Sequence, residues 1–157
     1  MKPQAAQHET SHYGRLAAMA VLSFLAMYAL MYAMVDDARN VYANLNQFYM
    51  AGLMTAPMVL FELVLMRGMY RNRRANMAIA AISAAALVLL FVLLRQQTAV
   101  SDRQFLQSMI PHHGGAVLMC EKAQLRDAEI RALCDKIIAG QEAEIQQMKD
   151  KLRTLRG

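Results

Sequence analysis

The sequence is poor in charge and lacks tryptophan altogether, and these shortages limit its class. Charged residues make up only 18% of its 157 residues, whereas hydrophobic residues, including 14 methionines, make up 57%. Soluble domains rarely have so apolar a composition, so we expect a membrane protein. The formal net charge of +5 reflects arginines beside apolar segments, and we expect no nucleic-acid partner.

The chain also lacks the residue patterns of common catalytic sites. Two cysteines without a C-x-x-C pair argue against a zinc finger and against a thioredoxin-type redox motif. The sequence contains no G-x-S-x-G motif and no P-loop, and it does not contain the two Glu-x-x-His motifs that a ferritin-like di-iron site needs. We therefore expect a protein that is not an enzyme.

Three long apolar segments are present instead. Residues 16–35 and 77–94 contain no charged residue and residues 48–66 contain one, and these segments run for 20, 18 and 19 residues. A helix needs about 20 residues to cross the ~30 Å core of a bilayer. The pattern predicts three transmembrane helices surrounded by membrane lipid. The first is too long for the apolar part of a signal peptide, so we expect a retained anchor.

Arginines beside these segments predict the orientation of the chain. Residues 67–76 carry four arginines, whereas residues 36–47 carry one arginine beside two aspartates. The positive-inside rule places the arginine-rich loop in the cytoplasm. We therefore expect a bacterial inner-membrane protein with a cytoplasmic N-terminal segment (1–12), a transmembrane domain (13–94) and a periplasmic domain (95–157).

The last third of the sequence changes to a charged, amphipathic pattern without strand alternation. Ser101 and Gln104 fit a capping box that starts a helix, and Asp127 suits the N-cap of a second helix. The predicted fold is all-α, with three transmembrane helices followed by a two-helix hairpin. A turn beside Asp127 would place Cys120 level with Cys134.

Positions at three- and four-residue spacing predict the buried face of each hairpin helix. In the first helix they are Phe105, Met109, His112, His113, Ala116, Met119, Cys120 and Ala123. In the second they are Ile130, Cys134, Ile137, Gln141, Ile145, Met148, Leu152 and Leu155.

The stretch SMIPHHGGAVLMC, residues 108–120, contains the residues most suggestive of chemistry. His112 and His113 lie between Met109 and Met119. Burying an unsatisfied imidazole costs about 1 to 3 kcal/mol, so two in succession require partners. The proline before them would kink or restart the helix and so turn both inward. Thioether and imidazole together favour Cu(I), with silver as a possible surrogate, so the stretch predicts a copper site.

A longer pattern around these residues resembles that of a known family. It reads M-x-x-H-H-x-x-A-x-x-M over residues 109–119 and Q-x-x-E-I-x-x-M over residues 141–148. This resembles the signature of the domain of unknown function 305 family, small ferritin-like helical proteins associated with copper binding, some of which have three membrane spans. The resemblance implies these ligands: Met109, His112, His113, Met119 and Met148. It also implies that the single hairpin is half of a four-helix bundle, completed in a homodimer or higher homo-oligomer.

The two cysteines allow three interpretations. Outside the cytoplasm Cys120 and Cys134 would form a disulfide if their Cα atoms approach within ~4.4 to 6.8 Å. Kept reduced, they would be further soft ligands near Met119, or unpaired packing thiols.

Methionines also recur in the membrane half, at residues 27, 31 and 34 of the first segment and at residues 50, 54, 58 and 66 of the second. Adaptable packing explains such methionines, although they could also line a copper path. Glu62, inside the second segment, should have a partner, for which Arg67 and Arg71 are candidates.

The predicted function is a membrane-anchored protein that sequesters copper or hands it to a copper-handling protein. The alternatives are a structural or assembly protein without a metal, and a methionine-lined copper transport component.

Overall fold

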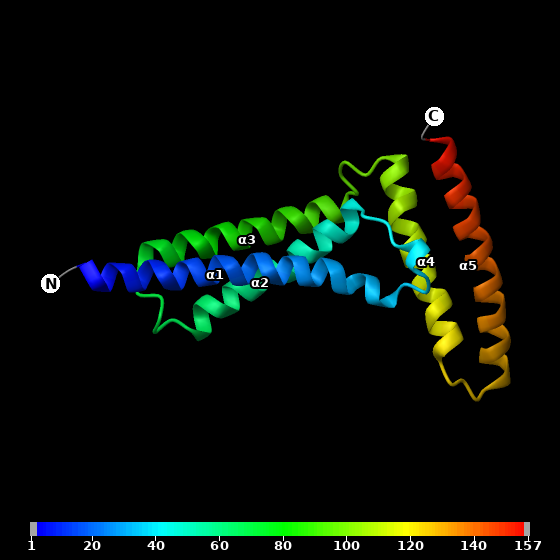
Figure 1. The fold of residues 1–157 in the computed structure, drawn as a ribbon, viewed down its shortest axis with the longest axis horizontal. Coiled ribbons are helices and arrows are strands. Elements are labelled where there is room, and N and C mark those ends of the chain that lie inside the picture. Colours follow the sequence, from blue (N-terminus) through cyan, green and yellow to red (C-terminus); the bar gives the residue numbers. More distant parts are fainter. Residues whose placement is uncertain (1–2, 156–157) are drawn as a thin grey trace. The chain divides into compact units, whose positions relative to one another are not determined.

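The fold of the computed structural model consists of five α-helices and two short 3-10 helices (Figure 1). The part of the chain that is described contains no β-strand. The structure describes residues 3–155, with side chains from residue 12 onward. The helices are α1 (Pro3–Leu30), α2 (Leu45–Leu65), α3 (Arg73–Arg95), α4 (Asp102–Lys122) and α5 (Ala128–Thr154). Two short 3-10 helices, η1 (Met31–Met34) and η2 (Ala38–Asn40), lie between α1 and α2. The all-α prediction is confirmed.

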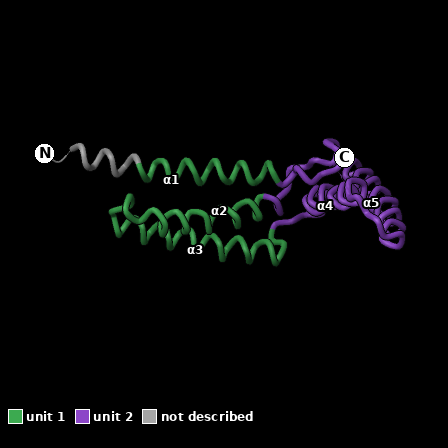
Figure 2. The backbone as a smooth tube through the Cα atoms, turned by 90° about the horizontal axis from the view of Figure 1, so that it is seen from below, with its two compact units in different colours: residues 1–30, 48–98 green, residues 31–47, 99–157 purple. Residues whose placement is uncertain are grey.

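The chain divides into two compact units that are interleaved in sequence (Figure 2). The first, here called the membrane unit, contains the residues up to 30 together with residues 48–98. The second, the hairpin unit, contains residues 31–47 together with those from 99 onward. The sequence-based division assigned residues 31–47 to the transmembrane domain. It also set residues 1–12 apart, whereas residues 3–12 are part of α1 and residues 1 and 2 lie outside the described range.

Three helical segments, most of whose residues belong to the membrane unit, are long and apolar enough to cross a membrane. They cover His12–Met34, Leu45–Leu65 and Arg73–Arg95, in agreement with the three predicted segments. Leu16, Val59 and Leu63 are buried together with Tyr70, and residues of α3 pack against them. By length and composition, these helices are of the kind that membrane proteins have.

A polar network closes the arginine-rich end of this unit. The Tyr70 hydroxyl donates to Oε1 of Glu62 at 3.2 Å, and Tyr13 donates to Oδ1 of Asn76 at 2.7 Å. The Asn76 amide donates in turn to the carbonyl oxygen of Tyr70 at 2.7 Å. Burial and the hydrogen bond to Glu62 raise the pKa of Tyr70, so its hydroxyl keeps the proton it donates. Tyr70, a residue that sequence reasoning did not consider, partners Glu62.

Both helices of the hairpin begin at the predicted N-caps. The Ser101 hydroxyl accepts from the Gln104 backbone at 3.4 Å, and the Asp127 carboxylate accepts from the backbones of Glu129 and Ile130 at 2.8 and 3.0 Å. Only half of the predicted capping box is seen, because Oε1 of Gln104 accepts from the Leu45 backbone at 2.9 Å. Gln104 therefore ties α4 to the segment 31–47.

The core of the hairpin unit lies between α4 and α5, which run side by side (Figure 1). Ile110, Val117, Ile145 and Leu152 are buried there, and Tyr42 of the segment 31–47 packs against them. Ile110 is 0% exposed and Val117 1%.

The predicted buried stripe of α4 is partly wrong. Phe105, His112 and Met119 lie on the exposed side, while Ile110 and Val117, which the stripe left out, form the core. The physical reason is that α4 is covered on two sides, by α5 and by η1 and η2, so its buried surface is wider than one stripe. The predicted restart of the helix at Pro111 is not seen, because α4 continues through it from Asp102 to Lys122.

Candidate metal site on the hairpin

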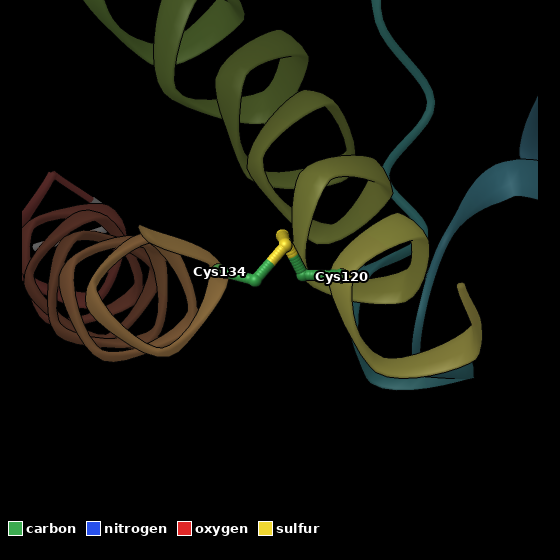
Figure 3. The surroundings of a disulfide bond; sticks show 2 residues. All are labelled: Cys120 and Cys134. Carbon is green, nitrogen blue, oxygen red and sulfur yellow. A yellow bond between two sulfur atoms is a disulfide. The ribbon is translucent and has the colours of Figure 1, made fainter. Parts of the chain in front are cut away.

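A disulfide fixes the end of the hairpin nearest its turn (Figure 3). Cys120 of α4 and Cys134 of α5 are joined with their Cα atoms 5.3 Å apart, inside the ordinary range for a disulfide. Of the three interpretations, the structure shows the disulfide, and it confirms the predicted register. A disulfide sulfur is not a thiolate, so these cysteines are candidate ligands only in the reduced chain.

The two histidines differ in their surroundings because neighbours on a helix point about 100° apart. His112 is exposed, whereas the His113 side chain is only 13% exposed and faces α5. Their ring centroids are 6.1 Å apart with the planes inclined at 61°. The continuous helix therefore turns one imidazole inward and leaves the other at the surface, and the expectation that both turn inward is wrong.

A carboxylate of the neighbouring helix accompanies the inner histidine. Nδ1 of His113 lies 3.0 Å from Oε2 of Glu144 on α5. Nδ1 makes no hydrogen bond within the described part of the chain, so the carboxylate lies close to it without a directed contact. With Nδ1 beside a carboxylate, Nε2 is the ring nitrogen left free to bind a metal, and a carboxylate near the other ring nitrogen is common among metal-binding histidines.

The methionines are distributed unevenly around this pair. Met109 precedes His112 by three residues and His113 by four, so on the helix it is a neighbour of both, although the two histidines themselves diverge. Met119 is two turns further on, about 10.5 Å along the axis, and is 55% exposed. Met148 is half-buried and packs against the core cluster between the helices. Geometry thus groups Met109 with the histidines and leaves Met119 apart.

Clusters of three or more His, Cys, Asp or Glu side chains that could hold a metal ion are not found in the part of the chain that is described. The donors that α4 brings together are one thioether and two imidazoles, a set suited to a soft ion.

Most of the methionines in and just after α2 are exposed. Met50, Met54 and Met66 are exposed, at positions that would meet lipid or another protein. Met58 is half-buried beside Pro57, in the middle of the helix.

Glu144 is the glutamate of the pattern over residues 141–148, but no role was predicted for it from the sequence. The signal was present, because residues level across the hairpin have numbers summing to about 254 and Glu144 lies within one turn of His113 on that count. Asp36, whose carboxylate lies against Gly114, is another residue for which no role was predicted. No sequence signal pointed to it. Nothing in the local sequence indicated that the segment 31–47 would return to α4.

Comparisons with known proteins give a family but no established activity. The chain is 28% identical over 137 residues to the uncharacterized protein L153 of Acanthamoeba polyphaga mimivirus, covering 85% of this chain and 88% of that protein. No solved structure matches the chain. The family described as Domain of unknown function (DUF305) matches residues 62–152, which include α3, α4 and nearly all of α5. The chain therefore belongs to the DUF305 family.

Proposed function

We propose that this protein is a membrane-anchored copper-binding protein whose hairpin unit binds Cu(I). Met109, His112 and His113 form the primary ligand set. The observation that carries the proposal is the spacing of these three donors within residues 109–113 of α4, with Oε2 of Glu144 3.0 Å from Nδ1 of the inner histidine.

The donor set favours a soft monovalent ion. Thioether sulfur binds Cu(I) well and Zn(II) poorly, whereas imidazole binds both. His113 supplies a partly buried, pre-oriented nitrogen, and His112 supplies an exposed one. A site with one exposed ligand suits exchange of copper with a copper-handling partner as well as sequestration.

The remaining predicted ligands take secondary places. Met148 of α5 packs between the two helices. A change of its side-chain rotamer would bring its sulfur toward the site, because the methionine side chain is flexible. Met119 belongs to a separate exposed position near the disulfide. Cys120 and Cys134 would bind copper only after reduction.

The hairpin unit is proposed to lie outside the cytoplasm, in the periplasm of a bacterium. The arginines of the loop between α2 and α3 favour this orientation, and an oxidising compartment suits a disulfide. The topology is also self-consistent. Two spans, α2 and α3, separate residues 31–47 from α4, so both parts of the hairpin unit emerge on the same side of the membrane.

A homo-oligomer is proposed to complete a ferritin-like four-helix bundle. The outer faces of α4 and α5 carry exposed apolar side chains, and a second hairpin would cover them. They are Phe105, Met119, Ile130, Leu133 and Leu155.

The proposal is tested by anaerobic titration of the full chain in detergent with Cu(I), in competition with a chromogenic chelator. We expect stoichiometric binding, similar binding of Ag(I), and weak binding of Zn(II). Replacing His112 and His113 together by Ala should abolish most of the affinity, whereas Met109→Leu should weaken Cu(I) binding selectively.

Met58→Leu is the matched control, because it removes a thioether from the membrane unit. If Cu(I) binds the double-histidine variant as tightly as the parent, the site is elsewhere. If the parent itself does not bind Cu(I), the histidines serve packing, and the structural or assembly alternative holds.

A further inference from the structure

A second site lies in the hairpin unit, on residues that the copper proposal does not use. A cavity of about 210 Å³ opens between α4, α5 and the segment 31–47. Its lining residues are Tyr42, Arg103, Gln107, Lys149, Leu152 and Arg153. Three cationic side chains converge there without a carboxylate among the lining residues.

We propose that this cavity, here called the basic pocket, binds a phosphate group. Arg103 is the anchoring residue, Lys149 supplies a second charge, and the Tyr42 hydroxyl and the Gln107 amide are additional donors. The phosphate is carried either by a membrane phospholipid or by a small soluble molecule.

Nearby carboxylates leave the charges of Arg103 and Lys149 available. No ion pair joins Arg103 or Lys149 to another residue of the described range, whereas Arg153 lies 3.3 Å from Oδ1 of Asp150. Lys149 interacts electrostatically with Asp37, but Asp37 already forms an ion pair with Arg39 at 2.6 Å. Hydrogen bonds from the side chain and backbone of Arg39 lower the pKa of Asp37 to about 2, so that carboxylate is ionised and its charge is matched by Arg39.

Partial burial of the pocket residues should strengthen their interaction with an anion. Arg103, Gln107 and Lys149 are half-buried, and Leu152, which is 6% exposed, forms its apolar wall. Cations held in a partly desolvated cavity interact with an anion more strongly than freely hydrated ones do. The planar guanidinium of Arg103 can donate two parallel hydrogen bonds to phosphate oxygens.

The size of the pocket limits its ligand. A water molecule occupies about 30 Å³ in the liquid, so the volume admits a phosphate group and a few attached atoms. It is below the ~300 to 1,000 Å³ of pockets that enclose drug-sized molecules. The rest of the ligand would therefore remain outside, as the acyl chains of a phospholipid would.

The pocket residues lie close in sequence to the ends of the apolar helices, which makes a lipid headgroup a possible source of the phosphate. Arg103 follows the last residue of α3, Arg95, by eight positions, and Tyr42 precedes α2 by three. Eight residues of chain reach at most about 28 Å, so a headgroup at the bilayer surface is within range. Free phosphate needs no such proximity, and the experiment separates the two sources.

The test uses the full chain purified and delipidated in detergent. Inorganic phosphate binding is measured by calorimetry, with acetate at equal ionic strength as the reference anion. Phosphatidylglycerol binding is measured by native mass spectrometry, with diacylglycerol as the lipid without phosphate. The pocket variant is R103Q/K149Q. The matched control, K122Q/K136Q, removes two exposed charges of the same hairpin outside the pocket.

We expect the pocket variant to lose affinity by about tenfold or more, because two charge-assisted contacts are removed. The control should retain the parent's affinity. Loss confined to phosphatidylglycerol identifies a lipid headgroup, and loss confined to inorganic phosphate identifies a soluble ligand.

Three results would overturn the proposal. They are equal loss in both variants, phosphate binding no stronger than acetate binding, and lipid binding that does not depend on the phosphate. If the double variant loses helicity, Lys149→Gln alone carries the test, since Lys149 is on the last turns of α5 and only half-buried. An unchanged affinity in that variant would equally contradict the proposal.

Discussion

Gly114 shows how one missing side chain organises the hairpin unit. A Cβ at this position would overlap the carboxylate of Asp36, which accepts two hydrogen bonds from the Asn40 amide at 2.7 and 3.0 Å. Asn40 is itself buried. Gly114→Ala would gain helix propensity worth up to ~1 kcal/mol, but it would displace the carboxylate and leave the buried amide unpaired at about 1 to 3 kcal/mol. We expect a net loss of about 1 to 2 kcal/mol, measured as a lower Tm by circular dichroism.

Gly140→Ala is the control for that substitution. Gly140 lies inside α5 and a Cβ there meets nothing within 4 Å, so only the helix propensity changes. The Tm should rise, by an amount reflecting up to ~1 kcal/mol. A Gly114→Ala variant as stable as Gly140→Ala would show that Asp36 moves aside at little cost.

Glu144 acts on the proposed copper site through His113 and so is a positioning residue. Glu144→Gln removes the charge facing Nδ1 while preserving size, and we expect Cu(I) affinity to fall about 10- to 100-fold, as for other partners of metal-binding histidines. Helicity and the Tm of the metal-free chain should not change, because Glu144 is more than half exposed. Glu142→Gln, on an exposed position of the same helix, should alter neither quantity. Equal affinity in both variants would rule out the positioning role.

The geometry of the candidate site could be predicted from the sequence only in part. The histidines and methionines could be identified from their spacing alone. Which histidine faces inward depends on the rotational setting of α4, and this is fixed by η1 and η2 covering its second side. A stripe drawn from periodicity assumes one buried side, so it chose His112 and Met119 over Ile110 and Val117.

At the scale of the element, the hairpin depends on its cross-link. The disulfide closes a loop with a sequence separation of 14, for which the chain-entropy model gives about 3 kcal/mol. Replacing Cys120 and Cys134 by Ser should lower the stability of the hairpin unit by about 2 to 4 kcal/mol. Thermal unfolding with and without a reducing agent measures this. Reduction should destabilise the parent by a similar amount and leave the double-serine variant unchanged, and a reductant effect on that variant would point to another cause.

Helix boundaries in the hairpin were predictable because local signals determine them. Ser101 and Asp127 have oxygen atoms that accept the first free N–H groups of α4 and α5, and no distant contact is needed for this. The three apolar helices were predictable for a similar reason, since length and composition suffice. The partner of Glu62 was not, because Tyr70 competes with Arg67 and Arg71 at similar separations along the chain and only packing decides between them.

At the scale of the whole molecule, the proposed topology makes a direct prediction. Alkaline phosphatase fused after Gly157 should be active, because the enzyme folds only outside the cytoplasm. The same enzyme inserted after Gly68, in the exposed loop between α2 and α3, should be inactive. Activity measured in whole bacteria, with fusion protein levels as the control, checks both positions. The reverse pattern would place the disulfide in a reducing compartment and invert the orientation.

The interleaving of the two units has a consequence for the order of synthesis. The segment 31–47 leaves the ribosome before α2 and α3, whereas its partner α4 is complete only about 75 residues later. At ~5 to 20 residues per second this delay is about 4 to 15 s. During that time Asp36, Asn40 and Tyr42 lack the surface of α4 against which their segment packs. The hairpin unit is therefore completed only after α2 and α3 have been synthesised, so its assembly cannot precede synthesis of the whole chain up to α4.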